Sequence, residues 1–181
     1  MGKGTQSARI QQAFGLCHVS TGDILRREIA RKSKPGLEAE SYVSRGAMVP
    51  DELIIRLVKR RLANDEQCQQ NGWLLDGFPR TAAQANAMVL AGLTPHHILV
   101  LDAADATVKD RVLGRAREAR RSGHTVRSDD NEATVQNRLR EYHKNRDAVL
   151  SEFDRFLRLS TVNGEPAVGN VTSAIRAALS Q

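Results

Sequence analysis

The sequence has few aromatic residues, two cysteines and no long hydrophobic run, and each shortage excludes a class of protein. Phe, Trp and Tyr make up 4% of the 181 residues, too few to supply a surface that stacks nucleic-acid bases. Cys17 and Cys68 lack the spacing of a zinc site, and we expect neither a zinc site nor a disulfide framework. No apolar run approaches the roughly 20 residues of a membrane helix, and the polar N-terminus carries no secretory signal. We therefore expect a cytoplasmic protein without nucleic-acid or membrane partners, and leave open an organellar targeting peptide upstream of Met1.

Arginine dominates the charged residues that are present. The 27 basic residues comprise 21 Arg and 6 Lys, and the net charge is +6. Guanidinium forks bind phosphate oxygens in a two-pronged geometry that an ammonium group cannot offer. The length and a hydrophobic fraction of 40% suit one globular domain over residues 1–181.

Helical patterns alternate with short apolar runs, and this alternation predicts an α/β fold with a parallel sheet. The clearest helix has an apolar stripe that includes Leu53, Leu57 and Leu62. We predict helices over 6–14, 21–31, 50–64, 81–91, 105–120, 132–153 and 166–179. We predict strands over 16–19, 73–75, 98–101 and 156–159, and a polar loop over 122–130.

Gly2 to Thr5 reads Gly-Lys-Gly-Thr and runs into the first predicted helix. Glycines let backbone N–H groups crowd around a phosphate, and a helix N-terminus adds a favourable dipole. By itself the motif is weak, because an N-terminal tail can carry chance glycines. Two further motifs, from Ser20 and from Asp76, each follow a predicted strand. Ligands of open α/β sheets bind at the carboxyl ends of the strands, so the three segments favour one shared site.

Five motifs in order along nearly the whole chain resemble those of the adenylate kinases, in the nucleoside monophosphate kinase family. They are Gly-Lys-Gly-Thr-Gln from Gly2, Ser-Thr-Gly-Asp-Ile-Leu-Arg from Ser20, Val-Pro-Asp-Glu-Leu from Val49, Leu-Leu-Asp-Gly-Phe-Pro-Arg-Thr from Leu74, and Arg-Ser-Asp-Asp-Asn-Glu from Arg127. The resemblance implies a P-loop kinase with a three-layer α/β/α fold. It also implies a helical AMP-binding region over about 21–50 and a short lid over about 116–130.

The resemblance implies reversible phosphoryl transfer, ATP + AMP = 2 ADP, with Mg²⁺ and no other partner than these nucleotides. Such a reaction asks the protein for positioning and charge neutralisation. The family pattern assigns ATP binding to Gly2, Lys3, Gly4, Thr5, Arg111 and Arg115. It assigns Asp76 to Mg²⁺, held through water. The expected oligomeric state is a monomer.

The same resemblance assigns AMP binding to Thr21, Arg26, Met48, Val49, Gly77, Arg80, Gln84, Arg127 and Arg138. It assigns direct action on the transferring phosphoryl group to Lys3, Arg80, Arg115, Arg127 and Arg138. Thr21 and Phe78 favour AMP, because relatives that act on UMP and CMP tend to carry Ala and Tyr there. We expect Asp129 and Asp130 to orient Arg127 and Arg138, or to cap the helix at Asn131. The lid contains no cysteine, so no zinc is expected in it.

The chain departs from the family pattern at its start, where a buried central strand and Gly-x-Pro-Gly-x would precede Gly2. Without that strand two neighbouring ladders would share no partner, and each unpaired buried backbone group costs about 1–3 kcal/mol. We therefore expect this polypeptide to be poorly stable and weakly active or inactive. Three alternatives stay open at this point: an AMP-binding module without catalysis, a UMP/CMP kinase, and a basic nucleic-acid-binding protein.

Overall fold

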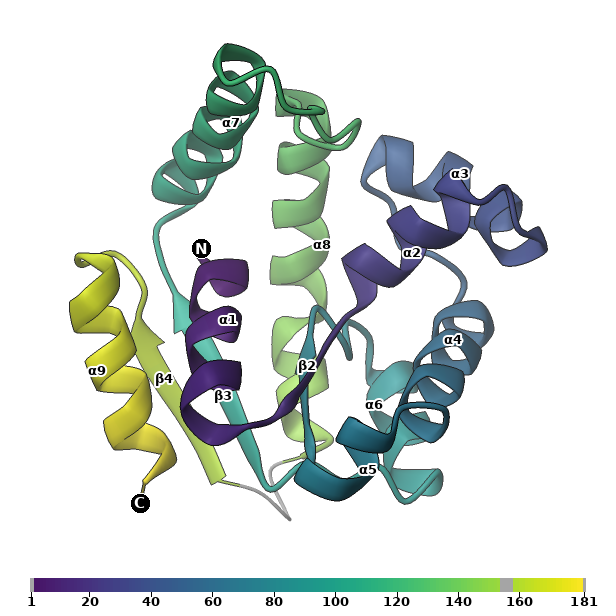
Figure 1. Cartoon of the computed structure of the whole chain (residues 1–181), viewed down its shortest axis with the longest axis vertical. Coiled ribbons are helices and arrows are strands. Elements are labelled where there is room, and N and C mark those ends of the chain that lie inside the picture. Colours follow the sequence, from purple (N-terminus) through teal and green to yellow (C-terminus); the bar gives the residue numbers. More distant parts are fainter. Residues whose placement is uncertain (1, 154–157, 181) are drawn as a thin grey trace.

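Helices and parallel strands alternate along the chain in the computed structural model, which describes residues 2–153 and 158–180 (Figure 1). The helices are α1 (Lys3–Phe14), α2 (Thr21–Ala30), α3 (Lys34–Arg45), α4 (Asp51–Ala63), α5 (Glu66–Asn71), α6 (Ala82–Leu90), α7 (Asp105–Arg121), α8 (Glu132–Ser151) and α9 (Val168–Leu179). The strands are β1 (Cys17–Ser20), β2 (Trp73–Asp76), β3 (His97–Asp102) and β4 (Arg158–Asn163). The predicted α/β class is confirmed.

The strands form two separate parallel pairs within the described residues. β1 pairs with β2 from Cys17↔Trp73 to Ser20↔Asp76. β3 pairs with β4 from His97↔Arg158 to Asp102↔Asn163. No ladder joins β2 to β3 in the described part of the chain, which agrees with the expectation of two ladders without a common partner strand.

Helix α1 packs across both strand pairs and joins them through side chains. Ile10 of α1 is buried in one apolar cluster with Leu101 of β3 and Ile175 of α9, and Leu74 of β2 packs against that cluster. A second, larger cluster collects the inner face of α4, including Leu53 and its neighbours, against β1 and α6. Burial of apolar surface contributes about 25 cal/mol per Å², so these clusters hold the two strand pairs together through side-chain packing.

Two helices were missed by the sequence pattern. Helix α3 begins after Ser33, whose hydroxyl accepts the Gly36 N–H, and it has proline in its first turn. Helix α5 has only six residues and is capped by Asp65, whose carboxylate accepts two backbone N–H groups. Helix α5 is too short to show a periodicity, and α3 presents only Ala39, Tyr42 and Val43 to the core, so periodicity alone did not find them.

Several predicted boundaries also move. Helix α1 begins at Lys3 and not at residue 6, so the Gly-Lys-Gly-Thr motif forms the cap and first turn of a helix. The last strand lies over Arg158–Asn163, later than the predicted 156–159, whose first two residues lie outside the described part. The cap of α8 is Asn131, which accepts the Thr134 N–H.

The expectation that the two cysteines form no disulfide is wrong. Cys17 of β1 and Cys68 of α5 are bonded to each other across 51 positions of sequence. The chain leaves α5 through Gly72, whose carbonyl accepts the Cys17 N–H at 3.0 Å, and this pairing brings the two elements side by side. A separation of 51 residues carries no signal for such a contact, because only the β1–β2 pairing creates it. Among the described helices, none is long and apolar enough to cross a membrane.

Candidate functional site

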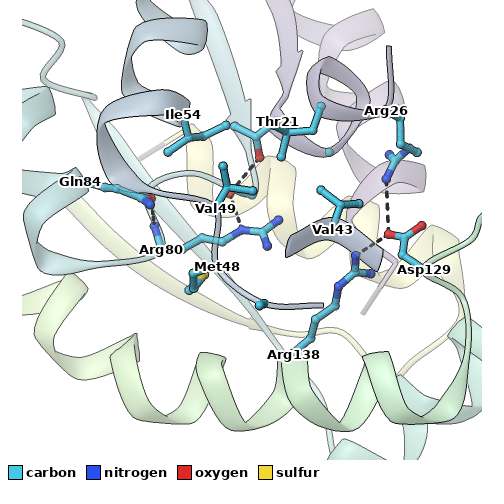
Figure 2. Close-up of a pocket in the computed structure, with 14 residues that line it drawn as sticks. Thr21, Arg26, Val43, Met48, Val49, Ile54, Arg80, Gln84, Asp129 and Arg138 are labelled. Carbon is cyan, nitrogen blue, oxygen red and sulfur yellow. Dashed lines mark hydrogen bonds and ion pairs between the residues drawn. The ribbon is translucent and has the colours of Figure 1, made fainter. Parts of the chain in front are cut away.

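A pocket opens where β1 and β2 end and α2 begins (Figure 2). It takes residues from α2, from α3 and the segment after it, from α4, from the turn after β2, from α6, from the loop before α8 and from α8 itself. Its lining consists of Thr21, Gly22, Leu25, Arg26, Val43, Ala47, Met48, Val49, Ile54, Gly77, Arg80, Gln84, Asp129 and Arg138. Of the residues predicted for AMP, only Arg127 does not line it.

The turn after β2 touches the start of α2 at the floor of the pocket. The Thr21 hydroxyl, which is buried, donates to the Gly77 carbonyl oxygen at 3.0 Å. Gly77 has φ +79°, and a Cβ there would lie 2.9 Å from both Thr21 Oγ1 and Arg80 Nη2. Glycine is therefore required at this position both by the backbone conformation and by the close approach of two pocket side chains.

The Arg80 and Gln84 side chains are fixed by contacts with the same turn. Arg80 Nε donates to the Gly77 carbonyl at 2.6 Å, and the Arg80 N–H donates to Gln84 Oε1 at 2.8 Å (Figure 2). Thr81 caps α6 by accepting the Gln84 N–H at 3.1 Å. One turn thus places a guanidinium group and an amide group on the same wall of the pocket.

Asp129 lies between two pocket arginines that come from distant parts of the chain (Figure 2). Its Oδ2 accepts a hydrogen bond from Arg138 Nη2 and lies 3.6 Å from Arg26 Nη1. The carboxylate is almost fully buried, and its Oδ1 has no hydrogen-bond partner among the described residues. Burial alone would raise the pKa of Asp129, but the hydrogen bond and charge of Arg138, with the charge of Arg26, lower it. The carboxylate therefore stays ionised, and its single negative charge is shared by the two arginines.

Helix α8 also holds the segment that carries Met48 and Val49. The Thr134 hydroxyl donates to the Ser44 carbonyl at 3.2 Å, and Asn137 Nδ2 donates to the Arg45 carbonyl at 3.1 Å. Gly46 ends α3 at φ +67°, and a Cβ on it would lie 2.7 Å from the Thr134 methyl group. This close contact fixes the chain that enters the pocket wall.

The N-terminus of α1 lies beside the pocket and carries Lys3. Gly2 caps this helix in a left-handed conformation without a side-chain cap, and the first helical hydrogen bond joins Gln6 N–H to the Gly2 carbonyl. The N–H groups of residues 3–5 therefore have no helical acceptor, which makes this helix end a suitable anion site. Lys3 Nζ lies 3.7 Å from Asp76 Oδ1. Partial removal from water lowers the pKa of Lys3, Asp76 opposes that change, and repulsion from Arg80 and Arg138 adds to it.

The remaining predicted ATP-side arginines lie on α7, and each has its own partners. Arg111 donates to the Gly164 carbonyl at 2.7 Å and to the Glu165 carbonyl at 3.0 Å. A Cβ on Gly2 would lie 4.0 Å from Arg111 Nη1, so the structure brings Arg111 to the N-terminus of α1. Arg115 makes a two-pronged ion pair with the buried Asp130, at 2.8 and 2.5 Å.

Arg127 is exposed on the loop between α7 and α8. The predicted orientation of Arg127 by Asp130 is not observed, because the Asp130 carboxylate pairs with Arg115. Desolvation, followed by repulsion from Arg26 and Arg115, lowers the pKa of Arg127. Arg127 itself does not line the pocket.

Two groups of side chains carry atoms of the kind that bind metal ions. Asp76 ends β2 beside the N-terminus of α1 and offers one carboxylate, which suits Mg²⁺ because that ion keeps several waters and takes few protein ligands. Cys17, Asp65 and Cys68 also lie together. The two cysteines are bonded to each other, and Asp65 caps α5 and pairs with Arg61, so this second group is already satisfied.

The sequence pattern missed the apolar part of the pocket. Leu25, Val43 and Ile54 line it, and Ile54 belongs to the stripe that periodicity assigned to the core. The apolar stripe of α4 predicted that this face of the helix is buried. It did not predict that part of the face lines a pocket. Apolar side chains together with Gln84 and Arg80 suit a flat ring that carries a phosphate at one end.

Comparison with known proteins gives consistent matches. A family model described as adenylate kinase matches residues 1–157. The adenylate kinase of Trichodesmium erythraeum is 35% identical over 184 residues, which cover 97% of this chain and 90% of that protein. The chloroplastic adenylate kinase of Zea mays is 36% identical over 191 residues, with 96% and 85% covered. The adenylate kinase of Renibacterium salmoninarum is 39% identical over 182 residues, with 98% and 90% covered.

Proposed function

The chain belongs to the adenylate kinase family, and from this premise we propose how its residues divide the work of the reaction ATP + AMP = 2 ADP. The protein is a nucleoside monophosphate kinase, a phosphotransferase with the P-loop kinase fold. We propose that the pocket beside β1 and β2 binds AMP and that the N-terminus of α1 binds ATP. One observation carries this assignment: eight of the nine residues predicted for AMP line one pocket.

On the acceptor side, Arg26, Arg80 and Arg138 would bind the AMP phosphate. Their guanidinium groups line the same pocket and offer forked donors to phosphate oxygens. Thr21, Gln84 and the segment at Met48 and Val49 would surround the base. The Thr21 hydroxyl already uses its hydrogen on Gly77, which leaves its lone pairs for a donor on the ligand.

On the donor side, the free amides of Lys3, Gly4 and Thr5 would bind ATP phosphates, with Gly2 allowing close approach. Lys3 Nζ and Asp76 Oδ1 lie 3.7 Å apart, beyond hydrogen-bonding distance. The ammonium group can therefore turn toward a phosphate, and the nearby carboxylate still offsets its positive charge. Arg111 would contact the adenine of ATP. The interactions of the amides and of the ammonium group both become stronger as negative charge develops between the two nucleotides in the transition state.

Phosphoryl transfer needs charge around the moving group and exclusion of water. We propose that Lys3, Arg80, Arg115, Arg127 and Arg138 supply that charge. Arg115 and Arg138 are already held by buried carboxylates, so both enter the reaction with their orientation set. Asp76 is the side chain that would hold Mg²⁺ through water, and that ion would neutralise charge on the ATP phosphates.

We propose that residues 1–181 form one domain and act as a monomer. Residues 21–50, which include α2 and α3, would form the AMP-binding region, and residues 116–130 a short lid. We also propose a cytoplasmic location. The alternatives of a non-catalytic AMP-binding module and of a UMP/CMP kinase gain no observation in their favour.

The assignment is tested by steady-state ADP formation from Mg-ATP with AMP, UMP or CMP as acceptor. We expect turnover with AMP well above turnover with the pyrimidine nucleotides. Arg26→Ala should raise the KM for AMP about 10- to 100-fold, because it removes a charged phosphate ligand. Arg27→Ala is the matched control, since Arg27 is the next residue of α2 and is exposed. Equal effects of the two substitutions would contradict the proposed AMP pocket.

A further inference from the structure

The first turns of α4 and α6 meet at one carboxylate, that of Asp51. Asp51 Oδ1 accepts a hydrogen bond from Gln84 Nε2 at 2.6 Å. Its Oδ2 accepts a hydrogen bond from the Thr81 hydroxyl at 3.0 Å. Asp51 comes from the Val-Pro-Asp-Glu-Leu motif and does not line the pocket, whereas Gln84 does. Asp51 therefore acts on the pocket only through its neighbours.

The Gln84 amide is held between two partners of opposite hydrogen-bonding character. The Asp51 carboxylate can only accept, so it requires the NH₂ group of Gln84 on its side. The Arg80 N–H can only donate, so it requires the carbonyl oxygen of Gln84 on the other side. A flipped amide would set oxygen against a carboxylate and NH₂ against an N–H group. Gln84 is also buried, so no water is available to relieve either clash.

One N–H group and one lone pair of the Gln84 amide remain for a ligand, and their order is fixed. Adenine presents an amino group at C6 beside an acceptor nitrogen, N1. A 6-oxopurine presents the reverse order, a carbonyl oxygen at C6 beside an N–H group. An amide of fixed orientation can pair with one of these edges but not with the other. Selection between them then depends on whatever prevents the amide from turning over.

We propose that Asp51 is a positioning residue that sets the acceptor specificity for adenine over 6-oxopurine nucleotides by fixing the orientation of the Gln84 amide. The proposal rests on the proposed function, in which Gln84 reads the base of AMP. It adds a residue that touches no substrate. Specificity then depends on two neighbours of the Gln84 amide: the Asp51 carboxylate, which can only accept a hydrogen bond, and the Arg80 N–H, which can only donate one.

The test compares AMP with IMP, which differ only at the C6 substituent and the proton on N1. The measured quantity is the ratio of kcat/KM for AMP to kcat/KM for IMP, with Mg-ATP as donor. Asp51→Asn keeps the size of the side chain but can offer Gln84 either an oxygen or an NH₂ group. We expect this variant to lower the ratio at least fivefold. Both substrates are assayed on the same preparation, so a partial loss of folded enzyme cancels in the ratio.

Glu52→Gln is the matched control. Glu52 is the exposed neighbour of Asp51 in the first turn of α4, so its substitution removes the same charge from the same helix end. We expect Glu52→Gln to leave the ratio unchanged. A second comparison places Asp51→Asn in a Gln84→Ala background, where the substitution should have no further effect on the ratio.

The outcomes separate the two proposals. If the unsubstituted protein forms no ADP from AMP, the proposed function fails. If it is active and Asp51→Asn changes the ratio less than fivefold, or no more than Glu52→Gln does, the role of Asp51 is overturned. A fivefold fall that persists without the Gln84 side chain also overturns it, because Asp51 would then not act through Gln84.

Discussion

The AMP pocket and the N-terminus of α1 balance their positive charges in different ways. In the pocket, the buried Asp129 lies between Arg26 and Arg138 and pairs with both. At the N-terminus of α1, Lys3 has nearly half of its side-chain surface exposed and lies 3.7 Å from Asp76, beyond hydrogen-bonding distance. The pocket arginines are thus held in place before any ligand arrives, whereas the lysine has room to move.

The two regions should therefore respond differently to the loss of a charged side chain. A buried ion pair restricts its side chains, but loss of either partner leaves an unpaired charge away from water. An exposed ion pair contributes little to stability and gives up its partner easily. The pocket should therefore be sensitive in stability as well as in activity, while the α1 end should be sensitive in activity alone. Three substitutions test that division, in order of falling effect.

Lys3→Met should have the largest effect and should act on turnover only. We expect kcat to fall about 1000-fold, which corresponds to about 4 kcal/mol, because an ammonium group that meets developing charge is lost. The free energy of unfolding should change by less than about 0.5 kcal/mol, since nearly half of the Lys3 side chain is exposed and its charge lies 3.7 Å from that of Asp76. Lys59→Met, on the exposed face of α4, serves as control for both measurements. A large loss of stability in Lys3→Met would contradict the expectation that the N-terminus of α1 affects activity alone.

Asp129→Asn should reduce stability by about 1–3 kcal/mol, because the charge that pairs with Arg138 and Arg26 is removed from a buried position. The pKa of Asp129 is lower in the folded protein than in the unfolded chain. Its contribution is therefore fully present above the unfolded value of about 3.9 and is lost as pH falls through the folded value. The variant should lose less stability than the parent as pH drops below about 4.

The measurement is urea unfolding from neutral pH into the acid range, with Asp147→Asn as control. Asp147 is 88% exposed and pairs only with its neighbour Arg146 among the described residues. We expect its substitution to leave the pH dependence of the parent intact. If the free energy of unfolding falls equally with pH in the parent and in Asp129→Asn, the ion pairs of Asp129 do not stabilise the folded protein.

Arg111→Ala should have the smallest effect, a rise of about three- to tenfold in the KM for ATP, or about 0.7–1.4 kcal/mol. Arg111 lies near Gly2 and is anchored by two carbonyl groups of the loop after β4, far in sequence from the AMP residues. The KM for AMP should not change. Arg117→Ala, at an exposed position of the same helix, is the control. A matching rise in the KM for AMP would show that the two ends are not independent.

Much of the site was predictable because each of its motifs directly follows a strand. Thr21 follows β1 and Gly77 follows β2, and parallel pairing brings these two ends together. The partners of the arginines were harder to predict. Asp130 was expected near Arg127 but pairs with Arg115, because the turn after Arg127 directs the Asp130 side chain toward α7. Local sequence cannot tell which of several nearby arginines a carboxylate will face.

The amino-acid sequence alone determined the family, the alternation of helices and strands, and the residue types that bind phosphate. Each of these depends on residues close together in the chain, such as a glycine before a helix or an apolar stripe. The tertiary structure decided which side chains share a partner: Asp129 with Arg26 and Arg138, Cys17 with Cys68, and Asp51 with Gln84. Such contacts join segments that meet only after the strands pair and the helices pack, so their geometry is fixed by the fold and not by spacing in the sequence.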